Sequence, residues 1–265
     1  MAEETILMVG CGRMGGAILR GLQAQGPREV WIVDPALPSH PGARAVASLK
    51  DLPPLDAPTV LLAVKPQVIG GLLPDLAPFA REGTLFLSII AGLTITGMRS
   101  VLGEGARIIR AMPNTPAAVQ MGISAAMAGP GVGEAERKRA DALLSAAGEV
   151  VWLEDEALID AVTAVSGSGP AYFFRFAEAL SQAGRAIGLP PEIAERLARR
   201  TLEGAGALAA ATDRSLAELR QDVTSPAGTT AAGLARFDAE DRLARLVEET
   251  VRAAQARAHE LGRPG

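Results

Sequence analysis

The first stretch of the chain that could do chemistry is a glycine-rich turn at residues 10–15. It has the pattern G-x-G-x-x-G, with glycines at Gly10, Gly12 and Gly15. An apolar run precedes it and a segment with helical spacing follows, so the glycines could permit a tight turn, let a pyrophosphate approach, and let helix and strand pack closely. A helix start also offers free N–H groups to phosphate. The pattern alone has little specificity, but in this context it favours dinucleotide binding over a purely structural turn.

Asp34, at the end of the second apolar run, bears on which dinucleotide could bind. An acid at this point can accept hydrogen bonds from the adenosine ribose, which favours NADH. A 2′-phosphate would be repelled unless a nearby arginine or backbone amide compensated, and the next arginine is Arg44. The alternative is a carboxylate that caps a turn before Pro35. The sequence therefore leaves open the choice between NADPH and NADH.

Two further loops follow apolar runs. Residues 63–66 read Ala-Val-Lys-Pro, and a lysine directly after a buried strand favours contact between Lys65 and cofactor phosphate or ribose over a surface role. In residues 110–116 two prolines stiffen the loop, and Asn114 has both donor and acceptor groups. An ordinary strand-ending turn explains this second loop equally well.

Residues 222–230 carry the most informative pattern. Ser225, Thr229 and Thr230 place hydroxyls around a Pro-Ala-Gly turn that leads into a helix. Free N–H groups at the helix start suit a carboxylate, and a hydroxyl can bond a substrate nitrogen. The alternative is an elaborate helix cap, which the pattern alone slightly favours because Ser and Thr are common caps. Residues 166–172, Ser-Gly-Ser-Gly-Pro-Ala-Tyr, also allow close approach at a helix start.

The remaining reactive residue types exclude several kinds of site. Cys11 is the one cysteine, so no internal disulfide can form and a reducing compartment is expected. His40 and His259 lie far apart in sequence, which argues against a histidine-based zinc site or triad. The acidic clusters at residues 154–156 and 238–241 are better explained as acids at helix starts than as metal ligands. No metal is therefore expected.

Charge and hydropathy limit the partners. The formal net charge of -4 and the pI of about 5.4 give no electrostatic reason to expect nucleic acid. No run of 18 apolar residues occurs, and residues 1–5 are short and acidic, unlike a signal peptide. A soluble cytoplasmic protein without membrane contact is the expectation.

The first half of the chain alternates apolar runs with helical stretches, and residues 13–25 place Met14, Ile18 and Leu22 on one helical face. This alternation predicts a doubly wound parallel sheet of the Rossmann type, with helices on both faces. With aromatic residues at 3%, its core must consist mostly of Ala, Val, Leu and Ile. The expected strands are residues 5–9, 30–33, 59–64, 84–90 and 107–111, with weaker ones at 123–127 and 150–153.

The second half is rich in alanine and predicts an all-helical domain. Residues 170–187 are apolar nearly all round, so this helix should be buried in a core or against another subunit. We therefore expect a dinucleotide-binding domain over residues 1–155 and a helical domain over residues 156–265. The expected helices are residues 157–165, 170–187, 191–211, 216–222, 229–237 and 241–261.

Taken together, the motifs resemble those of the pyrroline-5-carboxylate reductase family. The resemblance extends over almost the whole chain, and its last two motifs are far more specific than the glycine loop. One departure is Ala227, where the family usually has glycine, and we expect a negative φ there. The matching segments, in the family's order, are residues 10–17, 63–66, 112–116, 166–172 and 223–230.

The resemblance implies an N-terminal Rossmann domain and an all-α C-terminal dimerisation domain, as in 6-phosphogluconate dehydrogenase-like proteins. It implies an intertwined homodimer, sometimes assembled further into decamers. The implied reaction is the last step of proline biosynthesis. Hydride passes from the nicotinamide of NADPH or NADH to the C=N carbon of 1-pyrroline-5-carboxylate, which gives L-proline.

The resemblance also assigns roles to residues. Thr230 would hydrogen-bond the ring nitrogen, while Ser225 and the backbone of Gly228 and Thr229 would hold the carboxylate. Further substrate-site positions fall at Glu156, Asp213 and Asp222. The positions expected along the cofactor are Gly10, Cys11, Gly12, Arg13, Met14, Gly15, Asp34, Ala63, Val64, Lys65, Pro66, Ala91 and Asn114.

Three rival functions share parts of this pattern. A β-hydroxyacid dehydrogenase should carry a lysine on a helix of the second domain, but no lysine follows Lys138. A non-catalytic NAD(P)-binding regulator could use the same fold, although the hydroxyl-rich turn at residues 225–230 argues for catalysis. An imine or ketimine reductase with another ring substrate remains the third alternative.

Overall fold

The computed structural model describes residues 5–36 and 40–262, which form two compact units. Most of the acidic start, residues 1–4, lies outside the described residues. The sheet unit comprises the described residues up to Gly167 and from Ala254 onward, and the helical unit comprises Ser168–Ala253. The units divide later than the predicted domain boundary after residue 155, because the helix α5 (Leu158–Val162) belongs with the sheet.

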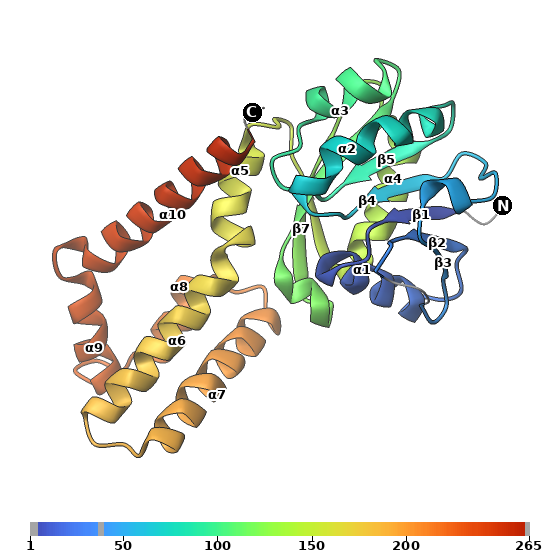
Figure 1. The fold of residues 1–265 in the computed structure, drawn as a ribbon. Helices are drawn as coiled ribbons and strands as arrows, with labels where there is room; N and C mark the ends of the chain where they lie inside the picture. Colours follow the sequence, from blue (N-terminus) through green and yellow to red (C-terminus); the bar gives the residue numbers. More distant parts are fainter. Residues whose placement is uncertain (1–4, 37–39, 263–265) are drawn as a thin grey trace. The chain divides into compact units, whose positions relative to one another are not determined.

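The sheet unit contains eight strands in the order β3-β2-β1-β4-β5-β6-β7-β8 among the described residues (Figure 1). Neighbouring strands are parallel, as predicted, except β6 and β7, so the predicted parallel sheet contains one antiparallel pair. The reason is the connection, a short 3-10 turn (Thr115–Val119) that leaves no length for a crossover helix. The strands are β1 (Ile6–Val9), β2 (Val30–Val33), β3 (Arg44–Val46), β4 (Thr59–Leu62), β5 (Leu85–Ser88), β6 (Arg107–Pro113), β7 (Gly122–Ala128) and β8 (Gly148–Trp152).

Helices cover both faces of the sheet, as predicted for a doubly wound fold. Ile6 and Met8 of β1 point into one apolar cluster, and Leu7 points into the other. All of these side chains are fully buried, which explains the continuous apolar runs of the strands. The first cluster includes residues of α1 (Arg13–Ala24) and α4 (Glu134–Leu144), and the second includes residues of α2 (Pro66–Leu76) and α3 (Ile95–Leu102).

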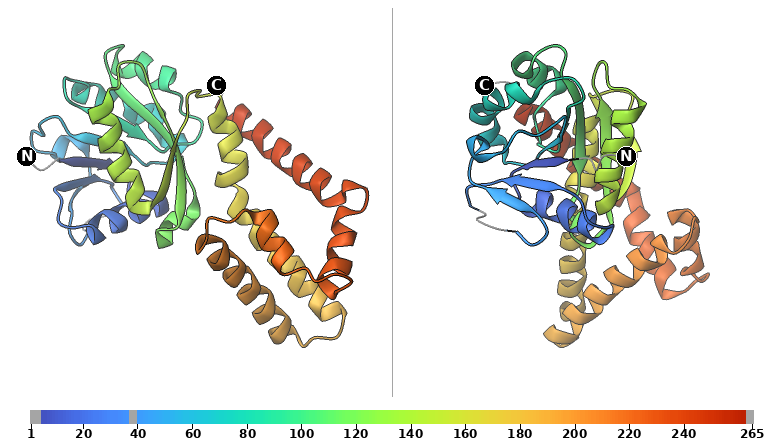
Figure 2. Two further views of the ribbon diagram at one scale, coloured as in Figure 1. Left: turned by 180° about the vertical axis from the view of Figure 1, so that it is seen from behind. Right: turned by 90° about the vertical axis from the view of Figure 1, so that its right-hand side faces the viewer.

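The helical unit contains α6 (Gly169–Ala186), α7 (Pro191–Ala210), α8 (Leu216–Asp222), α9 (Thr229–Asp238) and most of α10 (Arg242–Leu261). Helices α6 and α7 run side by side in opposite directions (Figures 1 and 2). The predicted helices are present with small shifts of their ends. Between α5 and α6, residues Thr163–Gly167 form a π-helical turn, so the Ser-Gly-Ser-Gly motif begins within it.

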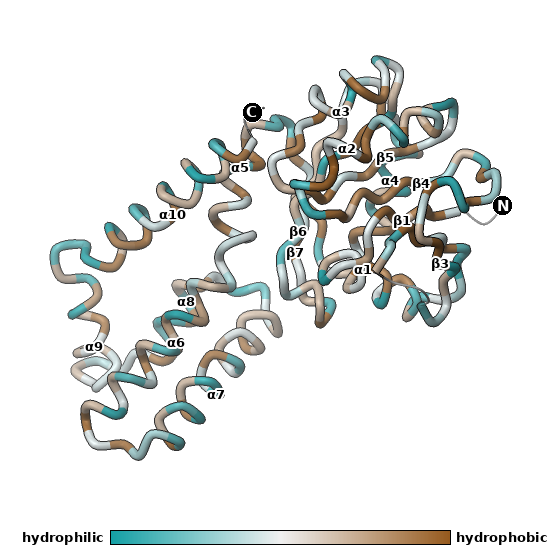
Figure 3. The backbone as a smooth tube through the Cα atoms, in the orientation of Figure 1, coloured by the Kyte–Doolittle hydropathy of each residue, from teal (hydrophilic) through white to brown (hydrophobic). Residues whose placement is uncertain are grey.

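Of the two expectations for α6, burial in a core of its own unit or against another subunit, the first is not met. Phe173 is 64% exposed and Phe174 is 60% exposed. The buried positions of α6 and α7 are small residues, namely Gly169, Ser181, Ala194 and Ala198. Hydropathy along the chain shows the contrast, with continuous apolar strands in the sheet and mixed helices in this unit (Figure 3). Among the described residues, no helix has the length and apolar character needed to cross a bilayer.

Candidate active site

The register of the sheet brings three predicted cofactor residues to one edge. β1 lies between β2 and β4, and Val9 is paired with Val33 on one side and Leu62 on the other. The residues that follow these aligned strand ends are Gly10, Asp34 and Ala63. The strand order reverses between β1 and β4, and ligands of such sheets bind outside the carboxyl ends of the strands at that point.

An open cleft of about 700 Å³ lies at this edge of the sheet. Six of the predicted cofactor residues line it, which means that segments far apart in the sequence meet as expected. Those six are Gly10, Gly12, Asp34, Ala63, Val64 and Lys65.

The geometry of the glycine loop fits a dinucleotide. Gly10 has a φ of +85°, and a Cβ there would lie 2.7 Å from Cγ1 of Val64. A Cβ on Gly15 would lie 3.0 Å from the carbonyl oxygen of Gly10, so helix and strand pack too closely for a side chain. A Cβ on Gly12, by contrast, would meet nothing within 4 Å, so this glycine opens the start of α1 to an approaching group. The backbone geometry of the three glycines is therefore the one expected of a pyrophosphate-binding loop, and their contact with pyrophosphate stays a prediction.

Asp34 holds the glycine loop in place. Its Oδ2 accepts a hydrogen bond from the N–H of Cys11 at 2.9 Å, and its Oδ1 accepts one from the N–H of Ala36 at 3.0 Å. The turn-capping role considered for this residue is thus present. An ionised carboxylate oxygen can accept more than one hydrogen bond, so a ribose hydroxyl can still be received.

The Cys11 thiol stays protonated at neutral pH. Burial raises its pKa, and the negative charge of Asp34 raises it further, while Arg20 acts in the opposite direction. A neutral, half-buried thiol is a poor nucleophile. Cys11 therefore fits a packing role in the loop rather than a catalytic one.

The other residues expected along the cofactor lie outside the cleft lining. Asn114 is 8% exposed, and its Oδ1 accepts a hydrogen bond from the N–H of Ile123 at 3.0 Å, so it braces the connection from β6 to β7. The contact with the cofactor predicted for Asn114 stays a prediction. Of the rest, Arg13 starts α1, Met14 packs on the core, Gly15 is buried, Pro66 starts α2 and Ala91 follows β5.

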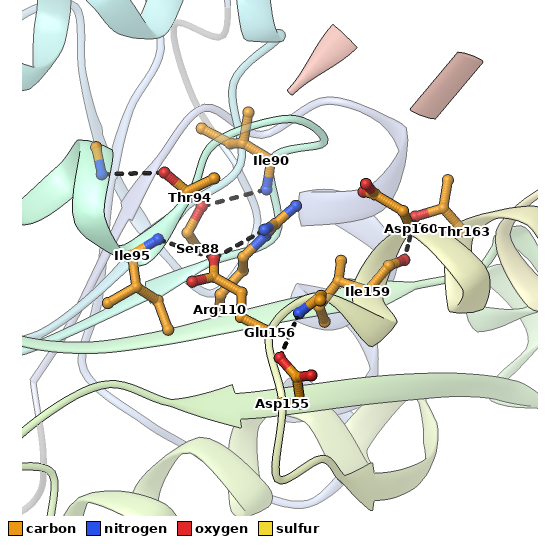
Figure 4. A network of polar contacts seen from close by, with 12 residues as sticks. Ser88, Ile90, Thr94, Ile95, Arg110, Asp155, Glu156, Ile159, Asp160 and Thr163 are labelled. Carbon is orange, nitrogen blue, oxygen red and sulfur yellow. Dashed lines mark hydrogen bonds and ion pairs between the residues drawn. The ribbon is translucent and has the colours of Figure 1, made fainter. Parts of the chain in front are cut away.

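Glu156, predicted to contact substrate, makes its observed bonds inside the sheet unit (Figure 4). Its Oε1 accepts hydrogen bonds from Nη1 of Arg110 at 2.8 Å and from the N–H of Ile95 at 2.9 Å. Arg110 lies on β6 and is 5% exposed, so Glu156 neutralises a buried cation and caps the start of α3. Sequence reasoning missed this pair. The available signal was a charged residue within the apolar run of β6.

The hydroxyl-rich turn lies in the helical unit. The N–H of Gly228 donates to the carbonyl oxygen of Ser225 at 3.0 Å, which closes a tight turn with Pro226 in its second position. Ala227 has a φ of +56°, so the expected negative φ is wrong. A turn with proline second and a positive φ third is of type II, which explains why the family usually has glycine at this point.

The hydroxyls of this turn do not cap helix α9, which argues against the helix-cap explanation. Helix α9 begins after Gly228 and has no side-chain cap. Ser225, Thr229 and Thr230 are exposed, and within the described part of the chain their hydroxyls form no hydrogen bond. The hydroxyls and the N–H groups of the first turn of α9 are therefore open to a ligand.

Asp222, an acid shortly before this turn, already pairs with Arg214. Its Oδ1 accepts a hydrogen bond from Nη2 of Arg214 at 3.0 Å, and its Oδ2 pairs with Nη1 of the same arginine. The guanidinium holds the pKa of Asp222 below its usual value. Asp213 is exposed next to the arginine. Arg214 thus links the segment before α8 to its end, and substrate contacts of Asp213 and Asp222 stay predictions.

Sequence similarity extends over the whole of this architecture. The chain is 40% identical to a pyrroline-5-carboxylate reductase of Pseudomonas aeruginosa, over 98% of both chains. The chain belongs to the pyrroline-5-carboxylate reductase family. It is also 35% identical to a family member of Arabidopsis thaliana, over 93% of this chain and 92% of that protein.

Family models match both halves. Residues 156–261 match the model described as pyrroline-5-carboxylate reductase dimerisation, and residues 5–92 match the one described as NADP oxidoreductase, coenzyme F420-dependent. The second range contains the glycine loop and the cleft, and the NAD(P)H cofactor predicted from the sequence is thereby confirmed. The first range contains the hydroxyl-rich turn.

Solved structures of the family have the same fold. A pyrroline-5-carboxylate reductase of Coxiella burnetii superposes with a TM-score of 0.92 at 33% identity, covering 100% of both chains. A Plasmodium falciparum pyrroline carboxylate reductase with NADP bound superposes with a TM-score of 0.82 at 26% identity, covering 99% of each chain. The predicted fold, a Rossmann-type unit followed by a helical dimerisation unit, is confirmed.

Proposed function

We propose that this member of the pyrroline-5-carboxylate reductase family reduces 1-pyrroline-5-carboxylate to L-proline by hydride transfer to the imine carbon. The observation that carries the proposal is similarity to family members over nearly the full length of the chain, combined with a glycine loop, Asp34 and Lys65 that line one cleft. The reduced nicotinamide of NADPH or NADH supplies the hydride when it is bound. A protonated imine is a good hydride acceptor, so the protein must mainly orient it.

The hydroxyl-rich turn is the proposed imine site. Thr230 donates to or accepts from the ring nitrogen and assists its protonation, because its hydroxyl is exposed and has no partner within the described part of the chain. Ser225 and the backbone of Gly228 and Thr229 hold the substrate carboxylate at the positive end of α9, while the N–H of Gly228 closes the turn that presents them. These roles rest on the family motif together with the open hydroxyls of the turn.

The assembly that we propose is a homodimer, which can build further into decamers. Its support is the match of residues 156–261 to a dimerisation model and the exposed phenylalanines of α6. We place the reaction in the cytoplasm, because one cysteine in the whole chain fits a reducing compartment. The proposed partners are the substrate and a second copy of the chain, with no nucleic acid or membrane.

Replacing Thr230 tests the proposed chemistry. Thr230→Ala should lower kcat/KM for the pyrroline substrate by roughly 10- to 1000-fold, the scale of losing one acid–base or hydrogen-bonding group. Thr230→Ser keeps the hydroxyl and should therefore retain most of the kcat/KM that Thr230→Ala loses. Both values come from the rate of NAD(P)H oxidation at varied substrate concentration. An unchanged kcat/KM in Thr230→Ala would remove this residue from the mechanism.

A further inference from the structure

Helix α8 directly precedes the hydroxyl-rich turn. It contains seven residues, Leu216–Asp222, and none of them is buried. Isolated helices shorter than about 12 residues are marginal in water, and α8 has no buried side chain that would anchor it in a core. Its position therefore depends on the polar contacts at its two ends.

Side chains hold both ends of α8. At its start, Oγ of Ser215 accepts a hydrogen bond from the N–H of Glu218 at 3.3 Å, and Oε2 of Glu218 accepts one from the N–H of Ser215 at 2.8 Å, which forms a capping box. At its end, Oδ1 of Asp222 accepts a hydrogen bond from Nη2 of Arg214 at 3.0 Å, and Oδ2 pairs with Nη1. Arg214 precedes the cap residue, so this pair spans the whole helix.

Hydrogen bonds continue from the end of α8 into the turn. The N–H of Thr224 donates to the carbonyl oxygen of Gln221 at 2.9 Å, and its Oγ1 donates to the carbonyl oxygen of Arg220 at 2.6 Å. Ser225 is the next residue, and its carbonyl oxygen accepts the N–H of Gly228 that closes the turn. The placement of the turn therefore follows from the placement of the last residues of α8.

The pair of Arg214 and Asp222 is suited to fixing a position rather than to stabilising the whole protein. A planar guanidinium that meets a carboxylate through two bonds fixes orientation as well as distance. The guanidinium holds the pKa of Asp222 below its usual value, so both partners are charged at neutral pH. Both side chains are about half exposed, and exposed ion pairs contribute little to the free energy of unfolding.

We propose that Arg214 is a positioning residue of the imine site, which holds Asp222 and thereby fixes how the end of α8 presents the hydroxyl-rich turn. The inference deepens the proposed function and rests on it, because it concerns the same turn. Asp222 then influences the reaction through the turn, whereas the family resemblance suggests that Asp222 contacts the substrate. The two accounts differ in whether Arg214 and Asp222 act as one unit.

Steady-state kinetics of the full-length protein separate these accounts. Arg214→Gln should raise KM for the pyrroline about fivefold, the scale of one exposed charge pair, and leave KM for NAD(P)H unchanged, because residues of the sheet unit line the cofactor cleft. Asp222→Asn should act alike, and the double variant should raise KM no further than either single one. Arg200→Gln is the matched control, since Arg200 pairs with Glu203 within α7, and it should change neither KM.

Reversing the pair gives a result that a damaged fold would not produce. Arg214→Asp combined with Asp222→Arg restores an ion pair across α8, so KM for the pyrroline should return toward its value in the unaltered protein. If Asp222 contacted the substrate, the reversal would remove that carboxylate and KM would stay raised.

Hydrogen exchange tests the pair without any reaction. With no ligand present, a peptide that spans residues 223–230 should exchange several times faster in Arg214→Gln, while the unfolding temperature stays close to that of the unaltered protein. Additive increases of KM in the double variant, or an unchanged KM and unchanged exchange in Arg214→Gln, would overturn the proposal. If the unaltered protein did not reduce the pyrroline, the proposed function would fail, and the exchange result alone would decide whether Arg214 fixes the turn.

Discussion

The two compact units treat their apolar residues in opposite ways. In the sheet unit, Ile6, Leu7 and Phe86 are completely buried within one chain, and helices cover both faces of the sheet. In the helical unit, Phe173 and Phe174 are more than half exposed. Monomeric proteins rarely leave large contiguous apolar surface in water. The sheet unit therefore completes its own core, whereas the large apolar side chains of α6 stay exposed within one helical unit, which fits the proposed self-association.

Removing a large side chain from the sheet core should have the largest effect. Phe86→Ala leaves a cavity under a fully buried ring and should lower the free energy of unfolding of the sheet unit by about 3–5 kcal/mol. Hydrogen exchange of β4 and β5 peptides, followed by mass spectrometry, should speed up by the same factor at every protein concentration. If the loss of stability disappeared at high protein concentration, the sheet core would also depend on self-association.

A charge on the exposed face of α6 should act on assembly instead. Phe173→Glu should weaken self-association by about 2–4 kcal/mol, as expected for an aromatic anchor, so that the mass measured by light scattering halves at micromolar concentration. Exchange of β4 peptides should stay as in the unaltered protein. Val101→Glu is the control and should leave the mass unchanged, because Val101 is 41% exposed and lies on α3 of the sheet unit. An unaltered mass for Phe173→Glu would show that this face is not the dimer contact.

Replacing Glu156 distinguishes two roles for this residue, namely stabilising the sheet unit and contacting the substrate. Glu156→Ala leaves the buried Arg110 without its partner and should cost about 2–3 kcal/mol of stability. Glu154→Ala, an exposed acid in the same cluster, should stay within about 0.5 kcal/mol. Denaturant unfolding gives both values. An unchanged stability combined with a raised KM would favour the substrate contact suggested by the family resemblance.

The smallest effect is expected at Ala227 in the helical unit. Its positive φ is strained for a residue with a Cβ, so Ala227→Gly should stabilise the turn by about 1 kcal/mol and keep activity. The neighbouring Gly228→Ala is the contrast, because its Cβ would lie 2.3 Å from Oγ of Ser225 and should displace that hydroxyl. Thermal unfolding and kcat/KM measure the two effects. A stabilising Gly228→Ala with full activity would contradict the proposed role of Ser225.

The sequence predicted those features that local patterns determine. Gly10, Asp34 and Lys65 each come shortly after an apolar strand. Because the carboxyl ends of parallel strands lie at one edge of the sheet, the sequence alone predicted that these residues line one cleft. The three-residue strand β3 was missed, because its Arg44 breaks the apolar pattern. The direction of β7 was missed because it depends on the length of the connection to β6.

Other features depend on contacts that no local pattern shows. The pair of Arg110 and Glu156 joins residues far apart in the sequence, and Lys50 enters the cleft only through the pairing of β3 with β2. At Ala227 the side chain favoured a negative φ, but the turn closed by Ser225 and Gly228 imposes a positive one. In each case tertiary geometry outweighed residue preference.

The transfer of hydride to the imine carbon is tested most directly by isotope. The purified protein would be incubated with 1-pyrroline-5-carboxylate and NADPH or NADH deuterated at nicotinamide C4, and the product analysed by mass spectrometry and NMR. The account predicts L-proline with one deuterium at C5, formed at a rate that falls in Thr230→Ala. Consumption of substrate without labelled proline, or labelling elsewhere in the ring, would contradict it.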